Sequence, residues 1–148
     1  MGEYKRYEQC ANAAEYLNQV LYIDNRINAK LSKIAYYRNL ATKTSGVSGT
    51  GKTGGASRHS RVEYCVMKIV ELENAANGDI DELVRLKGEI EAIIRKVERP
   101  IYRQLLELRY IAGLKWERVA LDMNKSYVHV VHNLYPQALK IIEKILNT

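Results

Sequence analysis

The sequence lacks phenylalanine and contains one tryptophan, two prolines and two cysteines. Its aromatic surface therefore comes from eleven tyrosines, which we expect at boundaries and interfaces because the tyrosine hydroxyl stays hydrogen-bonded. The prolines, Pro100 and Pro136, leave long stretches free to be helical. Cys10 and Cys65 are far apart and lack metal-ligand spacing, which excludes a disulfide scaffold. We expect both to be buried or half-buried free thiols.

Long apolar runs are also missing. No stretch of 18 apolar residues occurs, and the first ten residues lack the apolar core of a signal peptide. Arg6 stands where the myristoylation pattern requires serine or threonine. We therefore expect no membrane partner and a location in the cytoplasm. A length of 148 residues with 47% hydrophobic and 27% charged residues excludes collagen-like and wholly disordered proteins.

Positive charge is unevenly distributed along the chain. The net charge of +6 divides into +5 over residues 1–60, −2 over 61–100 and +3 over 101–148. A basic excess of this size is compatible with nucleic acid as a partner but does not require it.

Residues 3–42 lack helix breakers, and their pattern predicts one long helix with a narrow apolar seam. Asp24 and Arg38 interrupt that seam. The apolar residues recur at heptad-like steps: Leu17, Val20, Ile27, Leu31, Ile34 and Ala41.

Residues 42–60 are rich in glycine, serine and threonine, which predicts a flexible linker. Within it, Gly46 to Thr53 matches the phosphate-loop pattern G-x-x-x-x-G-K-[ST] at every fixed position. A working phosphate loop needs a buried strand before it and a helix after it. A long helix is predicted before this segment instead, and glycine, alanine and serine follow it. We therefore expect no nucleotide to bind here.

Residues 61–99 predict a second long helix that Pro100 ends. Gly78 costs about 1 kcal/mol inside a helix, and Asn77-Gly78-Asp79 could instead form a C-cap followed by an N-cap. We expect the helix to run through, and the acidic cluster of Asp79, Asp81 and Glu82 to lie on a solvated face. A seam of period 3.5 passes through Val62, Val66, Ile69, Glu73, Ala76, Ile80, Leu83, Lys87, Ile90, Ile94 and Val97.

The two long helices are expected to fold back as an antiparallel coiled-coil hairpin. Two helices alone make a poor core, so the hairpin needs a third helix, the C-terminal domain or a second copy. We expect a homodimer. The predicted fold is all-α, with a hairpin domain over residues 1–99 and a second domain over 100–148.

The C-terminal 49 residues predict four short helices. Pro100 suits a first helical position, and Gly113 suits the C-cap of that helix. The second helix, 116–123, has Trp116, Val119, Ala120 and Met123 on one face, and we assign Trp116 to the core. Asn124 and Lys125 form a tight turn, and Ser126 caps a third helix that turns Val130 and Leu134 inward. Tyr135, which precedes Pro136, is biased away from helical geometry, so Pro136 is expected to begin the last helix, with Leu139, Ile142 and Ile145.

A short helix, a tight turn and a capped helix are typical of a helix-turn-helix. The outward residues of the third helix are then the candidates for contact with base edges, and they are Tyr127, Val128, His129, Val131, His132 and Asn133. Lys115, Arg118 and Lys125 are the candidates for phosphate contacts, and Ser126 could add one beside its capping role.

The run LLELRYIAGLKWERVALDM followed by S-x-x-x-V resembles the region-four DNA-binding module of bacterial sigma factors. Over nearly its whole length the chain resembles small regulators encoded by phages and prophages of Gram-positive bacteria, related to late-gene activators. The resemblance implies a sequence-specific transcriptional regulator that activates transcription in the cytoplasm of a bacterial host, with double-stranded DNA and host RNA polymerase as partners. No arginine occurs between residues 119 and 148, so this helix cannot make the bidentate arginine–guanine contact. Either the tyrosine, histidines and asparagine read the bases instead, with Val128 against a thymine methyl, or tight operator binding is lost.

Two other functions fit the same pattern. One is a DNA-packaging subunit resembling a small terminase, which predicts a ring of many subunits. The other is a coiled-coil protein-interaction module without DNA binding. We expect no enzyme, because no nucleophile–base pair stands out, and no cofactor. His129 and His132 lack a third ligand at suitable spacing, so we expect no metal.

Overall fold

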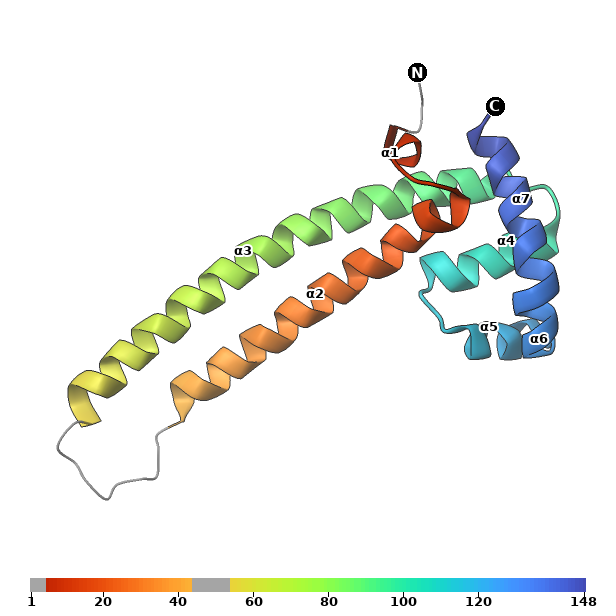
Figure 1. The fold of residues 1–148 in the computed structure, drawn as a ribbon. Helices are drawn as coiled ribbons and strands as arrows, with labels where there is room; N and C mark the ends of the chain where they lie inside the picture. The colour runs from red at the N-terminus through yellow and green to blue at the C-terminus, as the bar shows by residue number, and fades with distance from the viewer. Residues whose placement is uncertain (1–4, 44–53) are drawn as a thin grey trace. The chain divides into compact units, whose positions relative to one another are not determined.

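The computed structural model describes residues 5–43 and 54–148, and within these two ranges the chain forms helices and turns and no strand (Figure 1). The all-α prediction is confirmed to that extent. No helix in this described part is long and apolar enough to span a membrane. The phosphate-loop match at 46–53 lies outside the described residues. The helices are α1 (Lys5–Glu8), α2 (Ala13–Thr42), α3 (Gly54–Arg95), α4 (Pro100–Leu106), α5 (Trp116–Met123), α6 (Tyr127–His129) and α7 (Tyr135–Leu146), with π-helical turns η2 (Glu107–Ile111) and η3 (Val130–Leu134).

The chain divides into two compact units. Unit 1 comprises Met1–Tyr22 and Leu83–Thr148, and unit 2 comprises Ile23–Glu82. Both long helices contribute to both units, so the division falls inside α2 and α3 and not at the junction of residues 99 and 100.

The predicted single helix over residues 3–42 is wrong at its start. The chain turns between α1 and α2 because two side chains cap α2. The Glu15 backbone N–H donates to Asn12 Oδ1 at 2.9 Å, and the Ala11 N–H donates to Glu15 Oε2 at 3.0 Å. This is a variant of the capping box, in which a cap residue and an acidic residue three positions later satisfy backbone donors reciprocally.

Helix α3 is longer at its start and shorter at its end than predicted. It begins at Gly54, inside the predicted linker, and it passes through Gly78 without a break, as expected. Its last turn tightens, since the Lys96 and Val97 N–H groups donate to carbonyls only three residues back, both at 3.0 Å. The helix therefore ends before Pro100, which instead begins α4.

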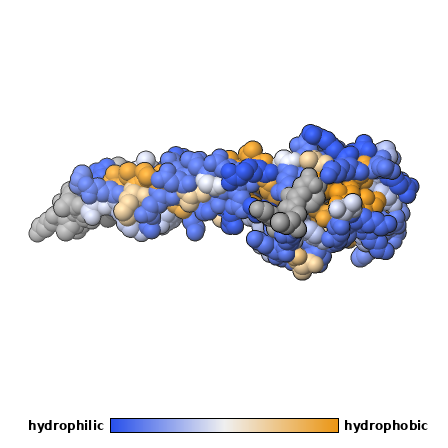
Figure 2. Space-filling model, turned by 90° about the horizontal axis from the view of Figure 1, so that it is seen from above, coloured by the Kyte–Doolittle hydropathy of each residue, from blue (hydrophilic) through white to orange (hydrophobic). Residues whose placement is uncertain are grey.

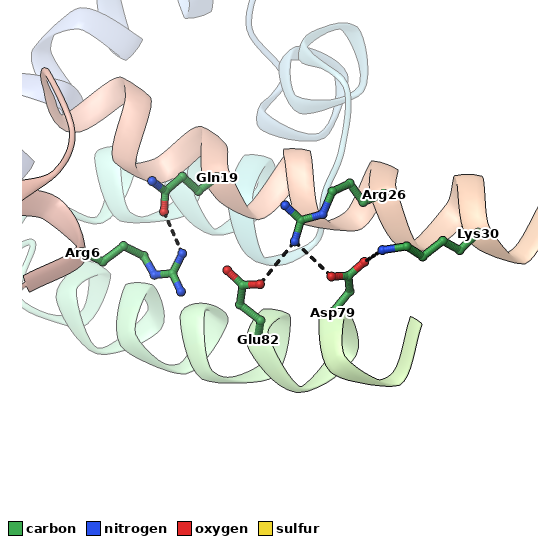
Figure 3. A network of polar contacts seen from close by, with 6 residues as sticks. All are labelled: Arg6, Gln19, Arg26, Lys30, Asp79 and Glu82. Carbon is green, nitrogen blue, oxygen red and sulfur yellow. Dashed lines mark hydrogen bonds and ion pairs between the residues drawn. The ribbon is translucent and has the colours of Figure 1, made fainter. Parts of the chain in front are cut away.

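In unit 2, charged side chains join α2 to α3 (Figure 3). Arg26 Nη2 lies 3.1 Å from Asp79 Oδ1 and 3.2 Å from Glu82 Oε2, and Lys30 also donates to Asp79. Together these cations hold the pKa of Asp79 below its usual range, with the Lys30 hydrogen bond the larger cause. Two of the three carboxylates assigned to a solvated face thus point at α2, and only Asp81 is exposed.

Further contacts between α2 and α3 in unit 2 join residues progressively later in α2 to residues progressively earlier in α3. Arg38 Nη2 lies 3.0 Å from Glu73 Oε1, and Arg61 donates to the Lys43 carbonyl at 2.8 Å. The Tyr37 ring meets the Tyr64 ring edge-on, with centroids 6.2 Å apart. Later residues of α2 thus meet earlier residues of α3, so the two segments run antiparallel within this unit.

The predicted seams are only partly buried. On α2, Leu17, Val20, Ile27 and Ile34 are buried, but Leu31 is 50% exposed. On α3 the buried side chains are Cys65, Ala76, Leu86, Ile90, Ile93 and Ile94, and Val97 just after the helix is buried too, whereas Val66 and Ile80 of the predicted seam are exposed. Over the part of α3 that holds Val66 and Ile80, the buried face is therefore rotated away from the predicted seam. Cys10 is half-buried and Cys65 buried, both free, as expected.

Unit 1 holds the larger core, built from α4, η2, α5, α7 and the ends of the long helices. Its fully buried side chains include Tyr16, Leu17, Leu105, Leu106, Tyr110, Val119, Val130, Ala138 and Ile142. Gly113 has a φ of 72°, so it ends the α4–η2 helix in the left-handed conformation that glycine favours. The prediction for Tyr135 is wrong: its φ of −61° and ψ of −48° are helical. Pro136 has no N–H to donate within the helix. The π-helical turn η3, which precedes it, lets the helix continue past this missing hydrogen bond.

Within unit 1, Glu143 of α7 joins the N-terminal segment to the last helix. The Tyr7 hydroxyl donates to Glu143 Oε2 and the Ala13 backbone N–H donates to Glu143 Oε1, both at 2.5 Å. The Asn147 amide adds a third bond, at 3.3 Å. These donors, Tyr7 first, lower the pKa of Glu143, and the carboxylate in turn raises the pKa of Tyr7. A carboxylate from the last helix thus caps the first residue of α2.

Replacing this carboxylate should destabilise the fold at neutral pH. A lowered pKa means that the stabilisation is present above about pH 4.3, the ordinary value for glutamate, and is lost as the pH falls through the folded-state value. We expect Glu143→Gln to lower the free energy of unfolding by about 1 kcal/mol at pH 7, since solvent screens this half-exposed site. Thermal unfolding by circular dichroism, from pH 7 down to pH 3, measures the difference.

The difference in stability between the two proteins should shrink as the pH falls toward 3. Glu98→Gln, which neutralises an exposed carboxylate of the same unit, is the matched control and should unfold like the wild type at pH 7. A Glu143→Gln variant that differs from wild type by the same amount at pH 3 and pH 7 contradicts an ionic role.

Candidate nucleic-acid interface

Helix α5 presents one buried and one exposed face. Val119, Ala120 and Met123 are buried, and Trp116 is half-buried, on the face predicted to point inward. Ala120 is 4% exposed, and α5 packs on α6 and η3. Its small side chain lets the neighbouring helix approach closely. Arg118, Leu121 and Asp122 lie on the opposite face and are exposed.

A tight turn ends α5. Asn124 has φ 57° and ψ 43°, the left-handed conformation that asparagine tolerates better than most residues. The Asn124 N–H donates to the Leu121 carbonyl at 3.1 Å, and the Lys125 N–H donates to the Ala120 carbonyl at 3.0 Å. The last carbonyls of α5 are thereby satisfied, and the chain reverses within two residues.

Ser126 begins the next helix. Its backbone is extended and its hydroxyl accepts a hydrogen bond from the His129 N–H at 3.2 Å, as predicted for an N-cap. The helix continues from α6 through η3 into α7, and it buries Val130 and Leu134, as expected.

The first turn of this helix is exposed and carries apolar surface. Tyr127 is 44% exposed and Val128 is 63% exposed. Leu121 of α5, which packs against α6, is 69% exposed. Leu121 was not among the predicted interface residues. The helical period is the signal that could have found it, because the same period that turns Val119 and Ala120 inward leaves Leu121 facing outward. Val131 is half-buried, so it offers less surface than its neighbours.

The three predicted phosphate-binding cations differ in their surroundings. Lys115 and Lys125 are exposed at the two ends of α5. Arg118 is exposed too, but its Nε lies 3.0 Å from Asp122 Oδ1 on the next turn. A phosphate must compete with that carboxylate for Arg118. The two lysines, at the start of α5 and in the turn after it, are therefore the better placed of the three for phosphate contacts.

The two histidines also differ. His132 is exposed, while His129 is half-buried and its Nδ1 lies 3.0 Å from the Asn133 amide nitrogen. An amide nitrogen can only donate, so His129 Nδ1 is the acceptor and the neutral ring carries its proton on Nε2. This hydrogen bond occupies part of the polar edge of Asn133. In the described part of the chain no group of three or more His, Cys, Asp or Glu residues is arranged to hold a metal.

A chain of aromatic contacts holds α5 against the rest of unit 1. The Tyr110 hydroxyl, buried in the core, bonds to Asn18 Oδ1 at 3.0 Å and to the Tyr135 hydroxyl at 2.7 Å. Burial raises the pKa of Tyr110, so it stays protonated and donates to Asn18 while Tyr135 donates to it. The Tyr135 and Trp116 rings meet edge-on with centroids 4.5 Å apart, and the Arg109 guanidinium carbon lies 4.7 Å from the centroid of the Trp116 ring. These contacts fix where α5 begins.

Removing the cap should loosen the first turn of the exposed helix. We expect Ser126→Ala to cost about 1 kcal/mol and to speed amide hydrogen exchange at His129, whose N–H loses its acceptor. Ser126→Asn, which keeps a capping oxygen, should leave both the thermal midpoint and that exchange rate close to wild type. Hydrogen exchange measured by NMR reports the local effect, and an unchanged His129 rate in the alanine variant would argue against the cap.

Comparison with known proteins supplies no further assignment for this interface. No protein-family model matches the chain, and neither a curated protein nor a solved structure does.

Proposed function

We propose that the protein is a sequence-specific DNA-binding transcriptional regulator, of the phage and prophage type with a sigma region-four-like helix-turn-helix. The supporting observation is the short helix α5, its two-residue turn at Asn124 and the Ser126-capped helix that exposes Tyr127 and Val128. A helix held in this way and exposed at its N-terminal turn suits insertion into a major groove.

In this proposal the exposed turn reads bases and the flanking lysines bind phosphates. Val128 contacts a thymine methyl, Tyr127 and His132 offer hydrogen-bonding groups, and no arginine is needed. Lys115 and Lys125, at either end of α5, position the helix on the backbone. Regulation proceeds in the cytoplasm of a bacterial host through a homodimer on paired half-sites, and activation through contact with RNA polymerase.

One observation favours a second candidate, a protein-interaction module. Leu121, Tyr127 and Val128 make the most exposed part of the interface apolar, and Arg118 is matched by Asp122. Exposed apolar side chains grouped in this way suit a protein partner as well as thymine methyls. A DNA-packaging subunit is distinguished by its mass, because it requires a ring of many copies.

DNA binding with a steep dependence on salt is the expected result. Fragments of host and phage DNA are selected by pull-down, and the enriched site is titrated by fluorescence anisotropy at several salt concentrations. Each phosphate contact contributes about −0.9 to the slope of log affinity against log salt. Lys115→Gln with Lys125→Gln should therefore reduce the slope by about two and weaken all sequences alike.

The bases are tested separately. Tyr127→Ala with His132→Ala should abolish the preference for the enriched site while keeping most of the salt dependence. Lys33→Gln, an exposed lysine of α2 in unit 2, serves as the control for charge and should behave as wild type. Selection of no sequence, or binding that is unchanged between low and physiological salt, rejects the proposal in favour of the interaction module.

A further inference from the structure

Helix α3 carries a second apolar stripe besides the face it buries. Val66 is 52% exposed, Val70 50%, Ile80 39% and Val84 66%. At 3.6 residues per turn these four side chains fall within an arc of about 80° on the helix surface. The buried residue Cys65 lies about 100° away from Val66 on the same helix. The stripe is therefore distinct from the buried face of α3.

Two polar residues occupy the middle of the stripe. Glu73 and Asn77 fall in the same arc, between the Val66–Val70 pair and the Ile80–Val84 pair. The order along the helix is apolar, apolar, polar, polar, apolar, apolar, with spacings of four, three, four, three and four residues. Figure 2 shows separate hydrophobic patches on a mostly hydrophilic face of the molecule.

This pattern is symmetric about Ala75. Val66 and Val84 lie equally far from that position, as do Val70 and Ile80, and so do Glu73 and Asn77. A copy of α3 turned end for end therefore presents an apolar residue to every apolar residue of the stripe. The heptad-like spacing of four and three is the one that packs along a partner helix.

The polar pair decides the direction of the partner. A parallel partner in register sets Glu73 against the same carboxylate of the second copy, which is unfavourable because like charges repel. An antiparallel partner sets the Glu73 carboxylate against the Asn77 amide, which can donate a hydrogen bond to it. Arg38, 3.0 Å from Glu73, already offsets part of the carboxylate charge.

We propose that a second copy of the chain packs its α3 antiparallel on this stripe, with the two-fold axis at the level of Ala75. The inference rests on the homodimer included in the proposed function and adds its surface and direction. Self-association is measured without DNA, so its failure and a failure of DNA binding are separate results.

Two substitutions test the surface and the direction by sedimentation equilibrium of the full chain. Val70→Glu places a charge in the stripe of both copies and should weaken dimerisation by more than about tenfold. Asn77→Lys creates two Glu73–lysine pairs in the antiparallel dimer and should tighten it roughly fivefold at low salt. In a parallel dimer the same lysines face each other, so Asn77→Lys weakens the dimer instead.

Leu31→Glu is the matched control, because Leu31 is also 50% exposed but lies on α2. It should leave the dimerisation constant unchanged, and circular dichroism should show wild-type helix content for all three variants. The proposal is overturned by a monomeric wild type, by a larger ring, by dimerisation that is insensitive to Val70→Glu, or by Asn77→Lys failing to tighten the dimer.

Discussion

The buried Tyr110 hydroxyl is the contact on which the arrangement of unit 1 depends. It joins Asn18 of α2 and Tyr135 at the start of α7, and Tyr110 itself lies in the π-helical turn after α4. Three segments distant in sequence thus share one hydrogen-bonded chain. A polar group that is buried without a partner costs about 1 to 3 kcal/mol, so burying the Tyr110 hydroxyl requires the half-buried Asn18 and Tyr135 to meet it in this geometry. The Tyr110 hydroxyl, whose burial costs free energy unless it is hydrogen-bonded, therefore also specifies how the helices meet.

The same unit is held by caps as much as by its apolar core. Glu143 reaches from α7 to the first N–H of α2, and Ser126 caps α6. In front of α2, Asn12 accepts a bond from the Glu15 N–H while the Glu15 carboxylate accepts one from the Ala11 N–H. Helix termini leave backbone groups that need partners. Here each of these partners is a side chain that also sets the direction in which the chain enters its helix, and a short helix such as α6 depends on it most.

Much of this could be predicted from local sequence signals. Pro100 at the start of α4, the left-handed Gly113, the turn at Asn124 and the Ser126 cap all follow from conformational preferences of single residues. The helical character of the described chain and the inward side chains Val130 and Leu134 follow from hydrophobic periodicity.

The errors have physical causes of two kinds. Tyr135 is helical although proline follows it, because a π-helical turn precedes the proline and the Tyr110 hydroxyl holds its side chain. Tertiary contacts there overcome a local preference. The break before α2 depends on the capping pattern of Asn12 with Glu15, which the heptad-like periodicity of residues 3–42 does not reveal. The partial exposure of the predicted α3 seam could not be predicted, since periodicity gives the angle between residues but not which side meets a neighbour. For the candidate interface, the Arg118–Asp122 pair and the exposure of Leu121 could have been predicted from helical spacing, because Arg118 and Asp122 are four residues apart and the helical period turns Leu121 outward.

The scarcity of tryptophan has a practical consequence. Trp116 is the sole indole in the chain, and at the start of α5 it contacts both the Tyr135 ring and the Arg109 guanidinium. Its ultraviolet emission therefore comes from one known place, beside the turn that leads to the exposed helix. Any event that shifts α5 against its neighbours changes the polarity and quenching around that ring. The unmodified protein thus carries its own optical probe at the position where partner binding is expected to be felt.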